Sequence, residues 1–157
     1  MALPAGAIAP DFTLPDANKT PVSLSSFRGK RAVLLVFYPF AFSGRCTAEL
    51  CELRDDLGAF ENEQVQVLAV STDTSQSLRA WAEAQGFTFP LLSDFWPHGA
   101  VARAYDVFFD RAGMALRGTF LVDADGVIVF SEANGPGERR DQTAWKRAVA
   151  ALPVRAG

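Results

Sequence analysis

The sequence predicts an α/β fold with a central mixed sheet flanked by helices, because strand and helix patterns alternate along its 157 residues. The clearest strand is the unbroken apolar run at residues 32–38, which is typical of a strand buried on both faces. The clearest helix follows at residues 46–62, where apolar residues recur every three or four positions. Apolar residues make up 49% of the chain, enough for one core, so we expect a single domain spanning residues 1–157.

The remaining elements follow from local patterns and turn residues. Buried strands are expected at 65–70 and 90–92, and helices at 75–85, 97–105 and 142–150. Gly86 is expected to end the second helix, and Trp145 and Val149 to form the inner face of the last one. Strands 119–122 and 127–130 flank Asp-Ala-Asp-Gly at 123–126, a turn sequence typical of a hairpin. A strand–helix–strand unit followed by a hairpin and a final helix is the thioredoxin-like order.

Charge and hydropathy exclude several classes of function. The net charge is −3 and the basic residues are scattered among acidic ones, so we expect neither nucleic-acid binding nor attraction to an anionic membrane. The longest apolar stretch, residues 32–42, is too short to span a bilayer and contains Pro39. The first ten residues carry no Lys or Arg and do not resemble a signal peptide. We therefore expect a cytoplasmic protein whose thiols are kept reduced.

Cys46 lies where the strand at 32–38 leads into the helix, and so in the first helical turn. Free N–H groups and the positive end of the helix dipole favour a thiolate there. A thiolate can attack one oxygen of a peroxide while the other oxygen leaves. Ser43, a candidate N-cap, offers a nearby hydroxyl, and Pro39 can shield the pocket. These residues leave two alternatives open for Cys46, a peroxide-reducing nucleophile or a small buried apolar side chain.

The segment Pro39-x-x-x-Ser43-x-x-Cys46 resembles the active-site loop of the peroxiredoxins, Pro-x-x-x-Thr/Ser-x-x-Cys. Residues 9–14 (Ala-Pro-Asp-Phe-Thr-Leu), 24–30 (Leu-Ser-Ser-Phe-Arg-Gly-Lys) and 117–123 (Arg-Gly-Thr-Phe-Leu-Val-Asp) also resemble that family. The resemblance covers nearly the whole chain. Residues 87–104, which contain Pro-Leu-Leu-Ser-Asp at 90–94, resemble the alkyl hydroperoxide reductase E subgroup.

The resemblance implies a role for each residue of the site. Cys46 would be the peroxidatic nucleophile that becomes a sulfenic acid, and Ser43 would hydrogen-bond the peroxide. Arg117 would stabilise the thiolate and orient the substrate, whereas without the family match an arginine in a strand is more often solvated. Pro39 would cover the sulfur, and Glu49 would hold an active-site arginine. Serine at 43 replaces the commoner threonine and lacks the methyl group that fixes the side-chain rotamer.

The resemblance also implies substrates and partners. The expected activity is thiol-dependent reduction of hydrogen peroxide and organic hydroperoxides, with peroxynitrite as a further candidate substrate. The expected reductant is a thioredoxin-type protein or a low-molecular-weight thiol, and a second copy of the chain would complete a homodimer. No cofactor is expected.

Cys51 is ambiguous from the sequence. The spacing Cys46-x-x-x-x-Cys51 resembles the bacterioferritin comigratory (Q-type) peroxiredoxins, in which the second cysteine resolves the sulfenic acid, whereas the E-type is often described as one-cysteine. Two residues five apart in an α-helix have Cα atoms about 9 Å apart. That exceeds the roughly 7 Å limit for a disulfide. Cys51 therefore either resolves Cys46 after the helix start unwinds, or only packs in the core.

Other functions remain as alternatives. A thiol–disulfide reductase on this fold would carry Cys-x-x-Cys, but position 49 is Glu. A peroxide-sensing thiol protein is a second alternative. A non-catalytic interaction domain is a third, and the retained loop residues and Arg117 argue against it. His98 is the only histidine, and with two cysteines it makes a poor zinc set, so no metal is expected.

Overall fold

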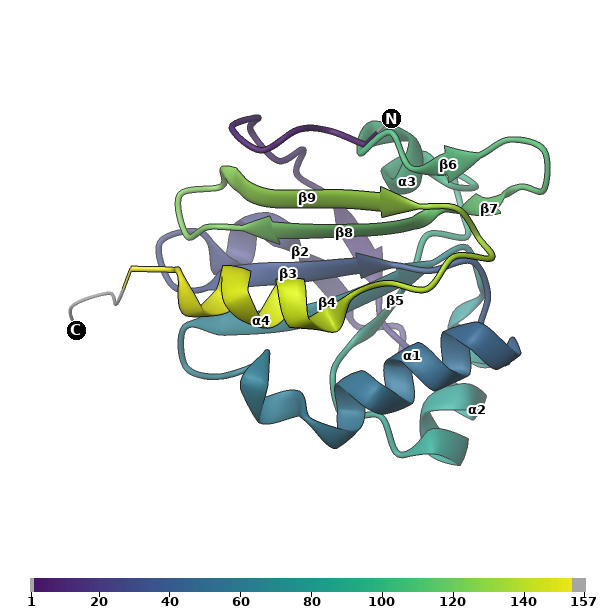
Figure 1. The fold of residues 1–157 in the computed structure, drawn as a ribbon. Coiled ribbons are helices and arrows are strands. Elements are labelled where there is room, and N and C mark those ends of the chain that lie inside the picture. The colour runs from purple at the N-terminus through teal and green to yellow at the C-terminus, as the bar shows by residue number, and fades with distance from the viewer. Residues whose placement is uncertain (1, 154–157) are drawn as a thin grey trace.

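The computed structural model describes residues 2–153, and a five-stranded sheet lies at its centre (Figure 1). The strand order is β5-β4-β3-β8-β9. The parallel strands are β3 (Ala32–Phe37), β4 (Val65–Ser71) and β5 (Leu91–Ser93). The antiparallel strands are β8 (Arg117–Val122), which pairs with β3, and β9 (Ile128–Asn134), which pairs with β8. The predicted α/β fold with a mixed central sheet is confirmed.

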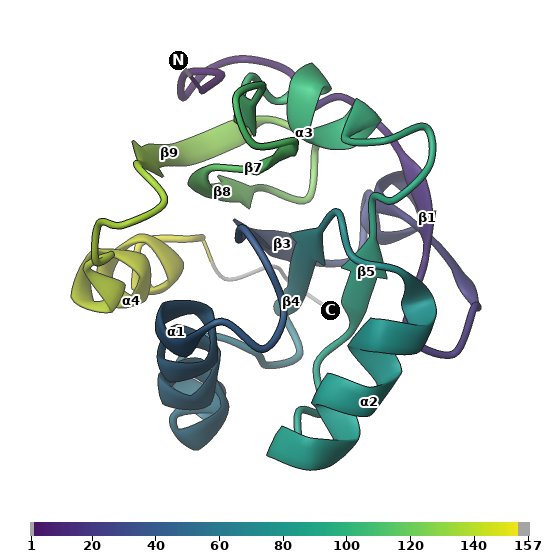
Figure 2. The ribbon, with the colours of Figure 1, turned by 90° about the vertical axis from the view of Figure 1, so that its right-hand side faces the viewer.

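Helices cover both faces of this sheet (Figure 2). One face carries α1 (Gly44–Asp55), α2 (Ser75–Gln85) and α4 (Gln142–Ala150), and the other carries α3 (Ala100–Ala104) and the N-terminal segment. Along β3, Leu34 and Val36 belong to the core cluster under the first face, and Val33, Leu35 and Phe37 to the cluster under the second. All six residues of β3 are therefore buried, which explains the unbroken apolar run.

Two helices differ from the prediction. The predicted helix at 46–62 is wrong at both ends, since α1 spans Gly44–Asp55 and a separate 3-10 turn, η2, follows at Leu57–Ala59. Asp56 ends the α-helix with φ −128°, yet Phe60, the residue after the 3-10 turn, is still buried, so the apolar spacing continues past the true helix end. The predicted helix at 97–105 is also too long, because Gly99 precedes α3 in a left-handed conformation with φ +70°.

Other bounds agree more closely. α2 and α4 span the predicted residues, and Gly86 ends α2 with φ +71°. The strand predicted at 32–38 corresponds to β3, which ends one residue earlier, and the strand predicted at 65–70 corresponds to β4, which ends one residue later. The strand predicted at 90–92 corresponds to β5, which is shifted by one residue along the chain. The hairpin at 119–122 and 127–130 is present but longer, because β8 begins at Arg117 and β9 runs on to Asn134.

Five short elements were not predicted. They are the pair β1 (Thr13–Pro15) and β2 (Pro21–Ser23), the 3-10 helix η1 (Leu24–Phe27), and the pair β6 (Phe108–Phe109) and β7 (Met114–Ala115). Elements of two to four residues are too short to display a periodic pattern. Within residues 2–153 no helix has the length and apolar character needed to cross a bilayer. The single-domain organisation stays a prediction.

Candidate active site

The sheet topology brings Cys46 and Arg117 to the same end of β3. The loop at residues 39–43 leaves the carboxyl end of β3 and leads into α1, in which Cys46 is the third residue. β8 runs antiparallel to β3, with Thr119 opposite Val36, so its first residue lies beside that same end. Side chains alternate along β8, which places Arg117, like Leu121, on the face that α1 covers.

Cys46 is fully buried in the first turn of α1. The first N–H groups of a helix have no partner within the helix, so this turn favours negative charge on the sulfur. Ser43 is the N-cap residue of α1, as predicted, but it makes no capping hydrogen bond. Its Oγ donates instead to the carbonyl oxygen of Phe40 at 3.0 Å, which leaves the lone pairs of Oγ able to accept. Pro39, the first residue of the loop, is buried.

Glu49 lies one turn beyond Cys46 on α1 and contacts two buried arginines. Nη1 of Arg117 donates to Oε1 of Glu49 at 2.7 Å, and Nη2 of Arg140 donates to the same atom at 2.7 Å. Nε of Arg140 adds a bond to Oε2 at 3.1 Å. The exposed fractions of the Arg117 and Arg140 side chains are 2% and 0%, so the solvated position considered for Arg117 is wrong. We call Glu49, Arg117 and Arg140 the arginine clamp.

Arg140 was not predicted from the sequence. It lies in the connection between β9 and α4, where no periodic pattern marks a buried residue. Its Nη1 donates to the carbonyl oxygen of Phe37 at 2.7 Å, and more weakly to the Gly118 carbonyl and the Thr119 hydroxyl. Arg140 thereby ties the end of β3, the start of β8 and helix α1 together.

The arginine clamp carries one more positive than negative charge. Burial acts to raise the pKa of Glu49, but the hydrogen bonds and charge of Arg140 and the charge of Arg117 outweigh it and hold that pKa below its ordinary value. Burial lowers the pKa of Arg140, although attraction to Glu49 and to the Cys46 sulfur opposes this, and arginine stays protonated in proteins. The surplus positive charge beside Cys46 attracts an anionic sulfur.

Acid should weaken the fold through Glu49. Because its folded-state pKa lies below the unfolded value, the carboxylate contributes stability that is fully present above about pH 4.3 and is lost as the pH falls through the folded pKa. Urea unfolding at a series of pH values below about 5 should show a falling free energy of unfolding. The fall should be shallower in Glu49→Gln, which has no carboxylate to protonate.

Glu83→Gln is the matched control for this measurement. Glu83 pairs with Arg79 on the exposed side of α2, where an ion pair contributes little to stability. The pH dependence of this control should follow the wild type. A Glu49→Gln variant whose free energy of unfolding keeps the full wild-type pH dependence would show that the Glu49 carboxylate is not the source of the acid sensitivity.

Cys51 is half-buried on α1 and faces the C-terminal end of α2. Its thiol donates to Oε1 of Gln85 at 3.4 Å, and both cysteines are free. Both cysteines belong to one continuous helix, so the Cα separation of about 9 Å argued from helix geometry applies to the reduced protein. A direct bond to Cys46 therefore requires α1 to unwind locally.

Two further features lie outside this constellation. Nε2 of His98 is hydrogen-bonded to the Gly113 carbonyl at 2.6 Å, and no group of three or more His, Cys, Asp or Glu side chains within residues 2–153 could hold a metal ion. Large aromatic side chains are exposed on two loops, one following β3 and the other following β5. They are Phe40, Phe42, Phe95 and Trp96.

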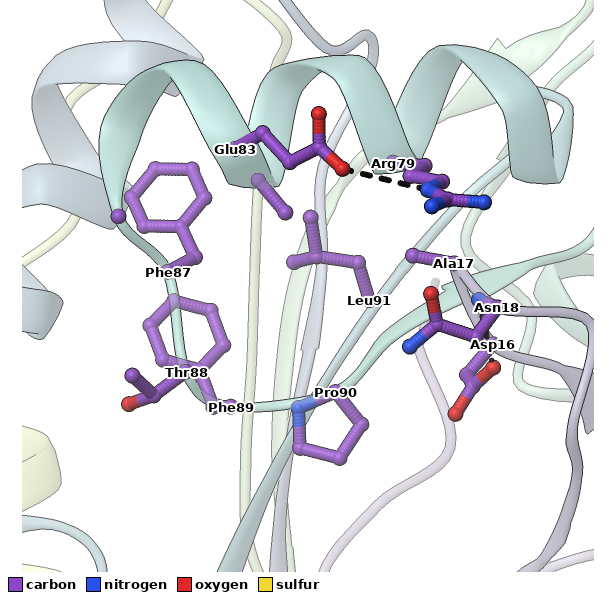
Figure 3. Close-up of a pocket in the computed structure, with 12 residues that line it drawn as sticks. Asp16, Ala17, Asn18, Arg79, Glu83, Phe87, Thr88, Phe89, Pro90 and Leu91 are labelled. Atoms are coloured by element: carbon purple, nitrogen blue, oxygen red, sulfur yellow. Dashed lines mark hydrogen bonds and ion pairs between the residues drawn. The ribbon is translucent and has the colours of Figure 1, made fainter.

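A pocket of about 380 Å³ lies along the C-terminal half of α2 (Figure 3), and Cys46 is not among the residues that line it. The ion pair between Arg79 and Glu83 lies at its edge, and Phe87 forms part of its wall. Asp16 and Asn18 approach from the turn between β1 and β2. None of the predicted site residues lines this pocket, so the cysteine chemistry is not located there.

A buried cysteine in the first turn of the helix that follows a central strand of such a sheet is the arrangement expected of a thiol-based oxidoreductase. Comparisons with known proteins identify the family. The AhpC/TSA family pattern matches residues 5–131. The chain is 56% identical over 147 residues to "Alkyl hydroperoxide reductase E" of Mycobacterium tuberculosis, covering 94% of this chain and 96% of that protein. It is 39% identical over 132 residues to "Peroxiredoxin Bcp" of Escherichia coli, covering 80% and 83%.

Solved structures agree. "Peroxidoxin BcpB" of Mycobacterium tuberculosis superposes with a TM-score of 0.83 at 30% identity, covering 96% of this chain and 98% of that one. AhpC of Enterococcus faecalis gives a TM-score of 0.85 at 30% identity, covering 96% and 92%. The chain belongs to the AhpC/TSA family of peroxiredoxins and is a thiol-dependent peroxidase. The predicted family, thioredoxin-like fold and enzyme class are confirmed.

Proposed function

We propose that Cys46 is the peroxidatic cysteine. Its thiolate attacks the terminal oxygen of a hydroperoxide, the S–O bond forms as the O–O bond breaks, and the leaving alkoxide or hydroxide takes a proton. The product is a sulfenic acid at Cys46. The observation that carries this proposal is a buried thiol in the first turn of α1, next to an arginine clamp with surplus positive charge.

The two arginines of the clamp have different roles in this proposal. Arg117 donates Nε to the Pro136 carbonyl and Nη1 to Glu49, and its Nη2 has no partner among residues 2–153. We assign this free nitrogen to the peroxide oxygens, where developing charge needs a donor. All three nitrogens of Arg140 are engaged by protein atoms, so Arg140 positions the clamp.

Ser43 and Pro39 complete the proposed site. Because the Ser43 hydroxyl proton is used by the Phe40 carbonyl, Ser43 accepts a hydrogen bond from the peroxide. Pro39 lacks an N–H group and covers the sulfur without competing for the substrate. Glu49 fixes the orientation of Arg117, since a guanidinium held by two carboxylate or carbonyl partners cannot rotate freely.

We propose hydrogen peroxide and organic hydroperoxides as substrates, with peroxynitrite as a further candidate. The name of the 56% identical relative supports an alkyl hydroperoxide. A thioredoxin-type protein or a low-molecular-weight thiol would return Cys46 to the thiol. A cytoplasmic location stays a prediction.

We also propose a homodimer. The exposed aromatic side chains at Phe40, Phe42, Phe95 and Trp96 support it, because a second copy of the chain would remove them from water. Sedimentation of the reduced protein measures the oligomeric state. A monomer throughout the micromolar range would contradict the proposal.

The direct test mixes the reduced protein with one equivalent of hydrogen peroxide in the absence of any partner. Intact-mass measurement should show the gain of one oxygen atom or the loss of two hydrogens, and peptide mapping should locate the change at Cys46. Continued turnover on addition of a thiol reductant distinguishes a peroxidase from a peroxide sensor. A reduced protein that leaves the peroxide unconsumed would overturn the proposal.

We propose that Cys51 resolves the Cys46 sulfenic acid by local unwinding of α1. The segment that must unwind contains Glu49, whose carboxylate is held by the arginine clamp and whose carbonyl oxygen accepts from Nε2 of Gln142 at 3.0 Å. It also contains the buried Leu50. These contacts oppose opening, so resolution is slower than attack on the peroxide. In the alternative, Cys51 is a packing residue of a one-cysteine peroxidase.

Cys51→Ser should leave the first step with peroxide unchanged and stall the protein as a sulfenic acid. The stalled variant should overoxidise more readily to sulfinic acid, because no thiol removes the intermediate. Peptide mapping of the oxidised wild type should show a Cys46–Cys51 disulfide, and hydrogen exchange should rise across residues 47–53. A long-lived sulfenate in the wild type, reduced only by external thiols, would establish the one-cysteine alternative.

A further inference from the structure

Asp73 links the connection between β4 and α2 to the loop at residues 39–43. Its Oδ2 accepts the backbone N–H of Ala41 at 2.8 Å. Within residues 2–153, this is the single hydrogen bond that joins the loop to any segment other than α1, the helix that it enters. The loop carries Pro39 and Ser43, so one carboxylate anchors the segment that surrounds the proposed nucleophile.

The anchored loop holds an unfavourable backbone conformation. Phe42, next to Ala41, has φ +66°, a left-handed conformation that is strained for a non-glycine residue. Such a conformation persists only where the surroundings enforce it. The side chain of Phe42 is 58% exposed, and its ring lies 6.2 Å from the ring of Trp81. Burial of this side chain therefore does little to hold the backbone in the left-handed conformation. Two hydrogen bonds also hold this turn, one within the loop from Ser43 to Phe40 and one from Ala41 to Asp73, and of these only the bond to Asp73 reaches another segment.

Asp73 is itself fixed by two buried serines. Oγ of Ser71 donates to the same carboxylate oxygen at 2.7 Å, and Oγ of Ser93 donates to the Asp73 backbone carbonyl at 2.6 Å. Ser71 and Ser93 end β4 and β5, so the central sheet determines where the carboxylate lies. Asp73 therefore fixes the position of the loop relative to the central sheet.

We propose that Asp73 is a positioning residue for peroxide reduction. Acting through the Ala41 N–H, it holds the loop so that the Ser43 hydroxyl and the Pro39 ring stay against Cys46. Asp73 does not touch the peroxide. The inference rests on the proposed role of Cys46, because a loop that positions nothing reactive would have no effect on rate.

The test compares Asp73→Ala with Asp73→Asn. Both variants remove the charge, but only asparagine keeps an oxygen that can accept from Ala41. The second-order rate constant for Cys46 oxidation by hydrogen peroxide should fall about 10- to 100-fold in Asp73→Ala, as for a misplaced reacting group. It should stay within about threefold of wild type in Asp73→Asn.

Asp123→Ala is the matched control. Asp123 is similarly half-buried and accepts two backbone N–H groups, from Asp125 and Val127, in the β8–β9 hairpin turn. The Asp123→Ala variant should have a lower free energy of unfolding and keep the wild-type rate constant for Cys46 oxidation. Ser71→Ala removes the hydroxyl that contacts both the carboxylate and the backbone N–H of Asp73. It should lower the rate constant severalfold, and it serves if Asp73→Ala fails to fold.

Several outcomes would overturn the inference. They are an Asp73→Ala rate constant equal to wild type, equal losses in the alanine and asparagine variants, an equal loss in Asp123→Ala, or no effect of Ser71→Ala. Each of these outcomes counts against the role of Asp73 when the wild-type protein reduces peroxide through Cys46. A wild type that is inactive, or that stays active as Cys46→Ser, would instead contradict the proposed function itself.

Discussion

Cys46→Ser should abolish peroxide reduction. The hydroxyl of serine is not appreciably ionised at neutral pH, so neither the surplus charge of the arginine clamp nor the first turn of α1 can turn it into a nucleophile. Serine is close in size to cysteine, so the buried site should still fold. Stopped-flow peroxide consumption measures the rate, and urea unfolding checks that the free energy of unfolding is retained.

Cys51→Ser is the matched control for this substitution, because it removes the other thiol of the same helix. It should consume the first equivalent of peroxide at the wild-type rate. If Cys46→Ser retains substantial turnover while folded, the nucleophile lies elsewhere. Cys51 would then be the first residue to examine.

Arg117→Ala should lower the rate constant with hydrogen peroxide by roughly 10- to 1,000-fold, the range found when an electrostatic stabiliser is removed. The substitution deletes one of the two cations beside Cys46 and its Nη2 donor, which has no partner within residues 2–153. Glu49 keeps Arg140 as a partner, so the carboxylate is not left unpaired. Alkylation of Cys46 at neutral pH should also slow, because removal of a neighbouring cation destabilises the reactive thiolate.

Arg117→Lys separates charge from geometry. Lysine keeps the positive charge but not the planar fork that reaches Glu49 and the peroxide together, so we expect a rate between alanine and wild type. Arg103→Ala is the surface control, since Arg103 is exposed, pairs with Asp110 and lies over the Phe108 ring. A wild-type rate in Arg117→Ala would show that this arginine only supports the fold.

The sequence alone determined those features that depend on residues close together in the chain. The apolar run at 32–38 predicted a doubly buried strand, and the patterns at 75–85 and 142–150 predicted α2 and α4 with the observed bounds. The placement of Cys46 at a strand-to-helix junction, with Pro39 and Ser43 just before it, is likewise local. Strand and helix periodicities and turn residues act within a few positions, so they can be recognised without the fold.

Helix ends were decided less locally. Apolar spacing alone continued the helix of Cys46 to residue 62, whereas the backbone at Asp56 ends it and η2 buries Phe60 in a different geometry. The side chain of Ser43 could likewise cap α1 in principle, but the loop conformation directs it to the Phe40 carbonyl. At the first place the burial of Phe60 beyond the helix prevailed over the periodic pattern, and at the second a hydrogen bond within the loop replaced the helix cap.

The tertiary structure alone decided how the site is held together. Glu49, Arg117 and Arg140 come from α1, β8 and the β9–α4 connection, and they meet because β8 runs antiparallel to β3 at the end where α1 begins. Asp73 reaches Ala41 because β4 lies parallel to β3, so their carboxyl ends are adjacent. No spacing along the chain encodes these contacts. They depend on the order and direction of strands, which the burial of both faces of the sheet imposes only once the whole chain has folded.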